Sequence, residues 1–257
     1  MIEDYLMQAL KVAFGAALTW FAGRFRKGFR KQFFFKVFGG SVANEEETSL
    51  VYGEFLLHPG MQFPPGVPKP YAYVKPVPTP KVPTNLYSIS KPISSCEIRA
   101  AKYLTERVSR ELDVTPLLRS DLDSIGLTDF SYISFGGPGS NLKSYDAIFH
   151  QDNGLVLFDN QRMWEVRTGR TLFTGSTPTH DYGLILKVCP SEHASRGRVW
   201  IVCAGFGEWG TSGSARYLAY NWRSIATFYG EKPFAIIVQV EGLKDDSARE
   251  VYASLTI

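Results

Sequence analysis

The sequence predicts a mixed α/β chain, a Rossmann-like three-layer sandwich with an antiparallel insertion, preceded by an N-terminal hydrophobic helix and a proline-rich linker. Over residues 85–257, apolar strand-like segments alternate with helix-like segments, a pattern typical of that architecture. Several short strand-like segments follow one another near the middle of this region, which indicates the antiparallel insertion. The chain has 257 residues, of which 44% are hydrophobic and 21% charged, a composition that excludes a disordered polymer.

Composition divides the chain into three parts. We expect a membrane-associated helix and basic-aromatic segment over residues 1–40, a proline-rich linker over 41–84, and the Rossmann-like domain over 85–257. Nine of the fifteen prolines lie within residues 59–83, so this stretch cannot be helical and favours an extended spacer. The segment SLVYGEFLLHP before these prolines is compatible with one edge strand.

Charge is concentrated at the N-terminus. Residues 1–40 contain seven cations and two anions, a net charge of +5, whereas the whole chain has a net charge of +3. The remaining residues therefore have a net charge of −2, from 21 cations and 23 anions. Because the body is nearly neutral, we do not expect it to bind nucleic acid directly.

Residues 5–22 form an apolar run close to the length that spans a bilayer. Its polar or small positions, together with one just before it, form a single stripe at helical spacing. This stripe consists of Asp4, Gln8, Lys11, Gly15 and Thr19. Three interpretations are open: a spanning helix that packs its stripe against other copies, a helix lying in the plane of the headgroups, or a helix docked on protein.

The basic-aromatic sequence RFRKGFRKQFFFK follows this run. Such clusters attract anionic lipid at about 1 kcal/mol per charge and hold their side of the membrane in the cytoplasm. We therefore expect membrane lipid as a partner, with the C-terminal domain in the cytoplasm at the cell membrane. The expected headgroup ligands are Arg24, Arg26, Lys27, Arg30 and Lys31.

The body has predictable elements. Helices are expected from Ser94 or Ser95 to Leu112, over 142–150, and from the glycine-rich loop at 205–213 to Gly230. Strands are expected at 86–90, 114–120, 130–135, 154–159, 163–168, 170–174, 182–188, 198–204 and 234–240, the last being the final core strand.

Three junctions between a strand and a helix carry residues suited to an anion or nucleotide. They are the segments 89–97, 135–141 and 204–213, rich in glycine or hydroxyl groups. The expected ligand-binding residues are Gly136, Gly137, Ser140, Asn141, Gly205, Gly207, Trp209, Gly210, Thr211 and Ser212. Free N–H groups at a helix start suit phosphate, and Trp209 could stack on a base. The competing interpretation is that the glycines only form turns.

Two carboxylates lie next to these junctions, Glu208 and Glu97. Either could activate water or polarise a ribose hydroxyl, and each could instead be a solvated residue in the first helical turn, especially Glu97. No metal is predicted because the four histidines are scattered and the three cysteines lack paired spacing.

The strand followed by AGFGEWGTSG at a helix start resembles the phosphate-binding junction of LOG and SLOG nucleotide-processing or nucleotide-sensing domains. This wider group includes domains of prokaryotic antiviral signalling proteins, often joined to a membrane helix. The resemblance covers roughly residues 130–240 and implies a nucleotide ligand. The chain lacks the paired glycines and downstream glutamate of the PGGxGTxxE motif, so the resemblance implies sensing more than phosphoribohydrolase activity.

Together these features predict a membrane-attached effector or sensor. Its body would bind a nucleotide or an upstream sensor protein, and its N-terminal helix would form homo-oligomers that perturb the membrane. One alternative is a hydrolase of a nucleotide N-glycosidic bond, such as that of NAD, using Glu208 or Glu97. A non-catalytic subunit of a larger complex is the other.

Overall fold

The computed structural model describes residues 28, 31, 34, 36–39, 49–54, 93–112, 115–192 and 197–255. The predicted polar stripe, the strand at 86–90 and, apart from Lys31, the predicted headgroup cations lie outside these residues. Within the described part of the chain, no helix is both long and apolar enough to cross a bilayer.

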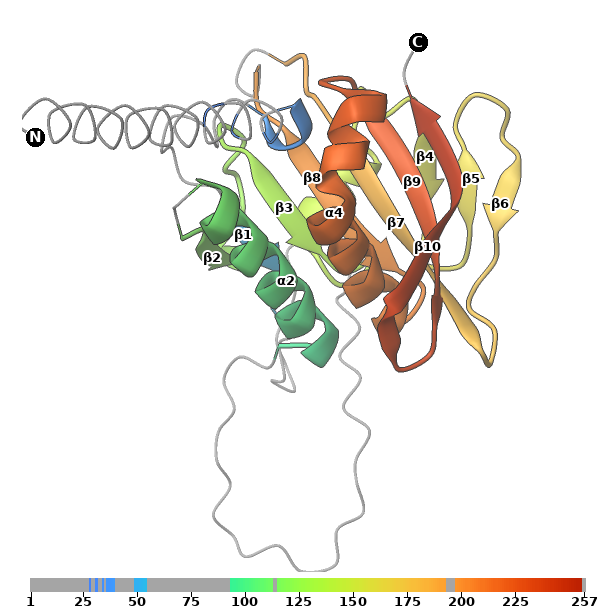
Figure 1. Cartoon of the computed structure of the whole chain (residues 1–257). Coiled ribbons are helices and arrows are strands. Elements are labelled where there is room, and N and C mark those ends of the chain that lie inside the picture. Colours follow the sequence, from blue (N-terminus) through green and yellow to red (C-terminus); the bar gives the residue numbers. More distant parts are fainter. Residues whose placement is uncertain are drawn as a thin grey trace, which may run out of the picture.

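The described residues form a mixed α/β structure with one large sheet and helices packed on it (Figure 1). The strands of the large sheet are β1 (Ser49–Tyr52), β2 (Leu117–Ser120), β3 (Tyr132–Phe135), β7 (His180–Val188), β8 (Trp200–Gly205), β9 (Phe234–Glu241) and β10 (Lys244–Leu255). A small sheet contains β4 (Val156–Phe158), β5 (Met163–Glu165) and β6 (Thr171–Phe173). The helices are α2 (Ser95–Leu112), η2 (Leu122–Ser124), α3 (Leu142–Ile148) and α4 (Glu208–Tyr229).

The seven-stranded sheet has the order β10-β9-β7-β8-β3-β1-β2. Strands β2, β1, β3 and β8 run parallel to one another, whereas β7, β9 and β10 each run antiparallel to the strand beside them. The arrangement is compatible with the predicted Rossmann-like class. The small sheet is antiparallel throughout, as expected for the insertion.

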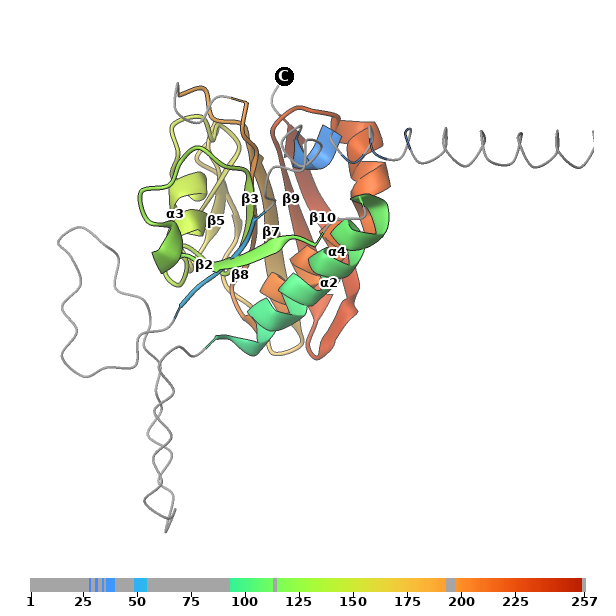
Figure 2. The ribbon, with the colours of Figure 1, turned by 90° about the vertical axis from the view of Figure 1, so that its left-hand side faces the viewer.

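Helices α2 and α4 cover one face of the large sheet, and α3 with the small sheet covers the other (Figure 2). Alternating side chains of the central strands enter the two cores. Ile201 and Cys203 of β8 pack with α2 and α4, while Trp200 and Val202 pack with α3 and β4. The sheet is therefore buried on both sides, which explains the continuous apolar runs of its central strands.

Two strands differ from expectation. β1 is not an edge strand, because it pairs with β2 on one side and β3 on the other. β10 was not expected at all, since FAIIVQV was predicted to be the last strand of the core. Among the described strands, β10 pairs with β9 alone and much of its length is exposed, so its sequence KDDSAREVYASL has no apolar alternation to mark it.

The last residues of the basic-aromatic segment lie in the core of the body. Phe34, Val37 and Phe38 are helical and at most 2% exposed, and they belong to the cluster formed by α2 and α4. The ring of Phe34 stacks on Phe38 at 4.2 Å and meets the edge of Trp222 of α4 at 5.2 Å. Phe34, Val37 and Phe38 are therefore part of the core of the body.

Candidate functional site

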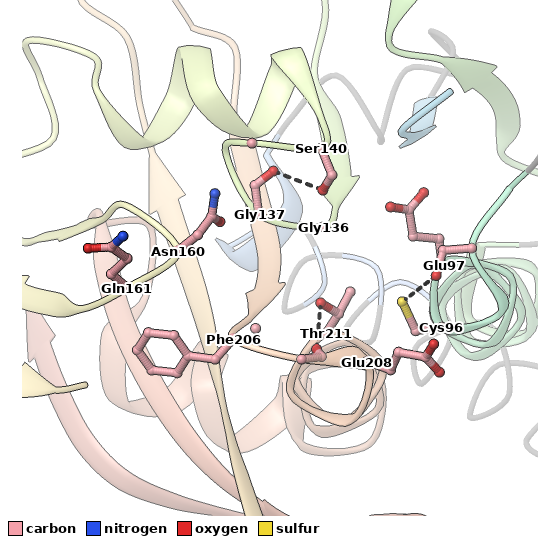
Figure 3. Close-up of a pocket in the computed structure, with 14 residues that line it drawn as sticks. Cys96, Glu97, Gly136, Gly137, Ser140, Asn160, Gln161, Phe206, Glu208 and Thr211 are labelled. Carbon is pink, nitrogen blue, oxygen red and sulfur yellow. Dashed lines mark hydrogen bonds between the residues drawn. The ribbon is translucent and has the colours of Figure 1, made fainter. Parts of the chain in front are cut away.

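A cavity of about 370 Å³ lies beyond the ends of β3 and β8, at the carboxyl edge of the parallel strands (Figure 3). Open α/β sheets bind their ligands at this position. It is lined by the start of α2, the loop after β3, the turn between β4 and β5, and the start of α4. The lining residues are Ser94, Cys96, Glu97, Gly136, Gly137, Gly139, Ser140, Asn160, Gln161, Gly205, Phe206, Gly207, Glu208 and Thr211.

The cavity brings together eight residues that the sequence analysis singled out. They come from all three predicted junctions and are Glu97, Gly136, Gly137, Ser140, Gly205, Gly207, Glu208 and Thr211. Separate segments therefore converge on one site.

Four other predicted ligand residues lie outside the cavity lining. The Asn141 side chain caps α3 and donates to the carbonyls of Val51 and Phe135. Trp209 lies under the guanidinium of Arg99, at 4.4 Å, so it does not present its ring to a base in the cavity.

The other two, Gly210 and Ser212, lie within α4, which begins at Glu208 instead of after the glycine loop. A Cβ on Gly210 would overlap the carbonyl of Tyr182, so this glycine permits the helix to approach β7. Ser212 donates a 2.6 Å hydrogen bond to Asp245. Both residues have packing roles that explain their identity without a ligand.

Glu97 is the most constrained polar group of the site. Its side chain is 2% exposed, so the expectation of a solvated first-turn residue is wrong. Oε2 accepts a 2.8 Å hydrogen bond from the amide of Gly53, and Oε1 accepts none from the described residues. Burial raises its pKa well above the usual range, against the Gly53 hydrogen bond and with a contribution from Asp121. Burial of Glu97 therefore favours the protonated, uncharged form of its carboxyl group.

Oε1 of Glu97 is directed toward the loop that follows β3 (Figure 3). A Cβ built on Gly136 would lie 2.7 Å from this oxygen and 2.8 Å from the Ser140 hydroxyl. Gly136 also has a φ of 93°, which favours glycine. Because residue 136 is a glycine, the space between the carboxyl of Glu97 and the hydroxyl of Ser140 stays open.

Glu208 and Cys96 differ from Glu97 in their surroundings. Glu208 is exposed at the start of α4 and accepts a 3.3 Å hydrogen bond from Ser95 across the gap to α2. Cys96 is buried and lies 2.9 Å from the hydroxyl of Ser94. Burial raises the pKa of its thiol to about 11, so it is not an activated nucleophile.

The start of α4 is already occupied by a carboxylate from β7. Asp181 is 4% exposed and accepts hydrogen bonds from the amides of Gly207 at 3.2 Å, Gly210 at 2.6 Å and Tyr182 at 2.8 Å. Burial nevertheless raises its pKa above the usual value. The amides predicted to hold phosphate instead hold this side chain.

The start of α3 is capped in the same way. The side-chain oxygen of Asn141 accepts hydrogen bonds from the backbone amides of Lys143 and Ser144. The carboxylate of Asp121 accepts a 3.0 Å hydrogen bond from the backbone amide of Leu142. Asp121 also accepts from the amide of Glu54, which ties α3 to the end of β1. At two of the three helix starts predicted to bind an anion, backbone amides thus already donate to side chains of the same chain.

Sequence reasoning missed Asn160, Gln161 and Phe206 as lining residues. Asn160 and Gln161 occupy the turn between β4 and β5, and a Cβ on Gly137 would overlap the amide oxygen of Asn160. The sequence marks this turn, but nothing in it indicates that the turn folds over the cavity. Phe206 lies inside the predicted glycine loop and was identifiable from its position there.

Within the described ranges, no group of three or more His, Cys, Asp or Glu side chains is placed to hold a metal ion. Comparison with known protein families and with curated proteins finds no match to this chain. The resemblance of the 204–213 junction to LOG and SLOG domains therefore stays a prediction.

Proposed function

We propose that this chain is a membrane-attached signalling effector or sensor whose Rossmann-like body binds a nucleotide-type ligand in the cavity. The observation that carries the proposal is Glu97, which is 2% exposed, lines the cavity with seven other predicted residues, and has a described hydrogen-bond partner on only one of its two oxygens. Burying a carboxyl group without a full set of partners is costly, so such a group is expected where a ligand supplies the missing hydrogen bond.

Helix α4 supports transmission from the cavity to the N-terminal segment. Thr211 in its first turn lines the cavity, and Trp222 contacts Phe34. Trp222 lies eleven positions after Thr211 in the helix, about 16 Å along the axis. A ligand that shifts α4 at the cavity end would alter the contact of this helix with Phe34. In this route the signal would reach the N-terminal segment through α4 and not through the proline-rich segment.

The sequence of residues 1–40 supports the membrane part of the proposal. Its net charge of +5 and its aromatic residues favour an anionic lipid surface. In the proposed mechanism, ligand binding promotes homo-oligomers of the N-terminal helix, and its polar stripe of Asp4, Gln8, Lys11, Gly15 and Thr19 perturbs the bilayer.

The test is membrane fractionation of the full chain and of a chain lacking residues 1–27. The deletion stops there because Phe34, Val37 and Phe38 belong to the core. We expect only the full chain to stay in the membrane pellet after alkaline washing. If both chains are recovered in the supernatant, the membrane attachment is wrong. Leakage of dye-filled vesicles on adding nucleotides then tests the effector step.

Glu97 also favours a second candidate, hydrolysis of a nucleotide N-glycosidic bond. Because burial favours the protonated carboxyl and Glu97 lines the cavity, it could donate a proton to the leaving base while water attacks the sugar carbon and returns a proton to the carboxylate. Release of base from NAD or a nucleoside, lost in Glu97→Gln, would favour this candidate over pure sensing.

A further inference from the structure

The described lining of the cavity contains acidic side chains and no basic ones, which is unusual for a phosphate-binding site at this position of an α/β sheet. Its described lining residues include two carboxyl groups, Glu97 and Glu208, and no Lys, Arg or His. Asp181 lies directly behind the cavity wall, where its carboxylate accepts from the amide of Gly207. A phosphate placed here would face the carboxylates of Glu208 and Asp181, and the described lining residues offer it no cation.

The start of α4 offers a phosphate little compensation. At the start of α4, the amides of Gly207 and Gly210 already donate to Asp181. An incoming phosphate would therefore have to displace a buried carboxylate. The same position in dinucleotide-binding folds is open and receives the pyrophosphate.

The hydroxyl groups of the site are oriented as acceptors toward the cavity. Ser140 donates its proton to the carbonyl of Gly137 at 3.2 Å, and Thr211 donates to the carbonyl of Gly207 at 3.4 Å (Figure 3). Each hydroxyl has only one proton, so both offer lone pairs to a ligand. They match a ligand with O–H or N–H donors and not a phosphate, which only accepts.

The remaining lining residues match a nucleoside. The amides of Asn160 and Gln161 can both donate and accept, as the edge of a base requires, and Phe206 supplies an aromatic surface. The volume of about 370 Å³ is near the lower end of the range for small-molecule sites.

From these contacts we infer that the cavity binds an uncharged nucleoside in preference to the corresponding nucleotide, with ribose hydroxyls donating to Ser140 and Thr211. The inference rests on the proposed function and narrows its ligand class. It differs from the phosphate-centred site that the glycine-rich junctions suggested.

The test measures binding of the four common ribonucleosides and their 5′-monophosphates to the full chain in mild detergent, by calorimetry at low salt. We expect at least one nucleoside to bind at least tenfold more tightly than its monophosphate. A monophosphate that binds as tightly or more tightly overturns this inference and leaves the proposed function standing. Absence of binding in both series overturns both.

A charge reversal gives a second, independent readout. Glu208 is exposed, so Glu208→Lys should fold, and it should reduce the preference for the nucleoside to about threefold or less. Glu106→Lys, at an exposed site on α2 outside the cavity lining, should leave the preference unchanged. An unchanged preference in Glu208→Lys, or an equal change in both variants, contradicts the role of charge.

Discussion

The amine of Lys187 donates a 2.5 Å hydrogen bond to the backbone carbonyl of Lys36, which joins the centre of the large sheet to the end of the N-terminal helical segment. Lys187 is 1% exposed. Because the last carbonyls of a helix lack intrahelical partners, a lysine at this position caps the segment. The same strand, β7, thus carries Asp181 at the start of α4 and Lys187 at this joint.

Burial lowers the pKa of Lys187 to about 8, opposed by Cys189 and Glu231. Between about pH 8 and 10.5 the unfolded chain keeps this proton while the folded chain has lost it, so stability should rise with pH. Relative to Lys187→Met, the wild type should gain roughly 2 kcal/mol from about pH 8 to 9.5, or about 4–8 °C in Tm. The control is Lys102→Met, at an exposed site, whose Tm should follow the wild type at each pH. If the Tm of Lys187→Met also follows the wild type, the pKa of Lys187 is not lowered in the folded chain.

The joint also depends on Phe34, whose ring is fully buried against Trp222 and Phe38. Phe34→Ala should destabilise the chain by about 3–5 kcal/mol, because it leaves a cavity in the core. For a domain of this size, 3 kcal/mol corresponds to a fall of roughly 6–12 °C in Tm. Phe228→Ala, at a site 78% exposed on α4, should have little effect. Similar melting of both variants would show that residues 34–38 do not pack on the body.

Much of the fold follows from the sequence because its strands and helices have strong local patterns. The strands β8 and β9 are mostly apolar, and α2 and α4 end near predicted residues, α4 at Gly230 with a φ of 61°. β10 could not be predicted, since an exposed edge strand needs no alternation. The true start of α4 was also hidden, because Gly210 and Gly213 disfavour a helix locally and are explained only by close packing on β7 and β9.

The cavity itself was predictable in part. Glycines after β3 and β8 indicated its location, because strand ends at one edge of a sheet meet there. The role of Asp181 could not be inferred, since it lies 26 residues before Gly207 in the sequence. The burial of Glu97 was equally hidden, because it depends on the close approach of Gly53, which directly follows β1, a strand whose central position was not expected.

Glu97→Gln tests the protonation state of the buried acid. Above about pH 4.5 the folded chain keeps a proton that the unfolded chain loses, so the wild type loses stability as pH rises toward the raised pKa. The variant has no such loss. Its Tm relative to wild type should therefore rise from pH 4.5 to 7, and its amide should still donate to a ligand, so that nucleoside binding is retained.

The control for this measurement is Glu106→Gln, at an exposed site on the same helix. Its Tm should follow the wild type at each pH. Glu97→Ala should lose nucleoside binding, because it removes the hydrogen-bonding group. If Glu97→Gln destabilises the chain more at pH 7 than at pH 4.5, the pKa of the buried carboxyl is not raised in the folded chain.

Asp181→Ala tests whether the carboxylate occupies an anion site. The variant removes the acceptor of the Gly207, Gly210 and Tyr182 amides, so it should lose about 2 kcal/mol, or roughly 4–8 °C in Tm. With the amides released, the helix start becomes able to bind inorganic phosphate. Millimolar phosphate should therefore raise the Tm of Asp181→Ala and leave that of the wild type and of the exposed variant Asp246→Ala unchanged. An equal rise in all three proteins would mean that phosphate acts elsewhere on the chain, since only one of them has an open helix start.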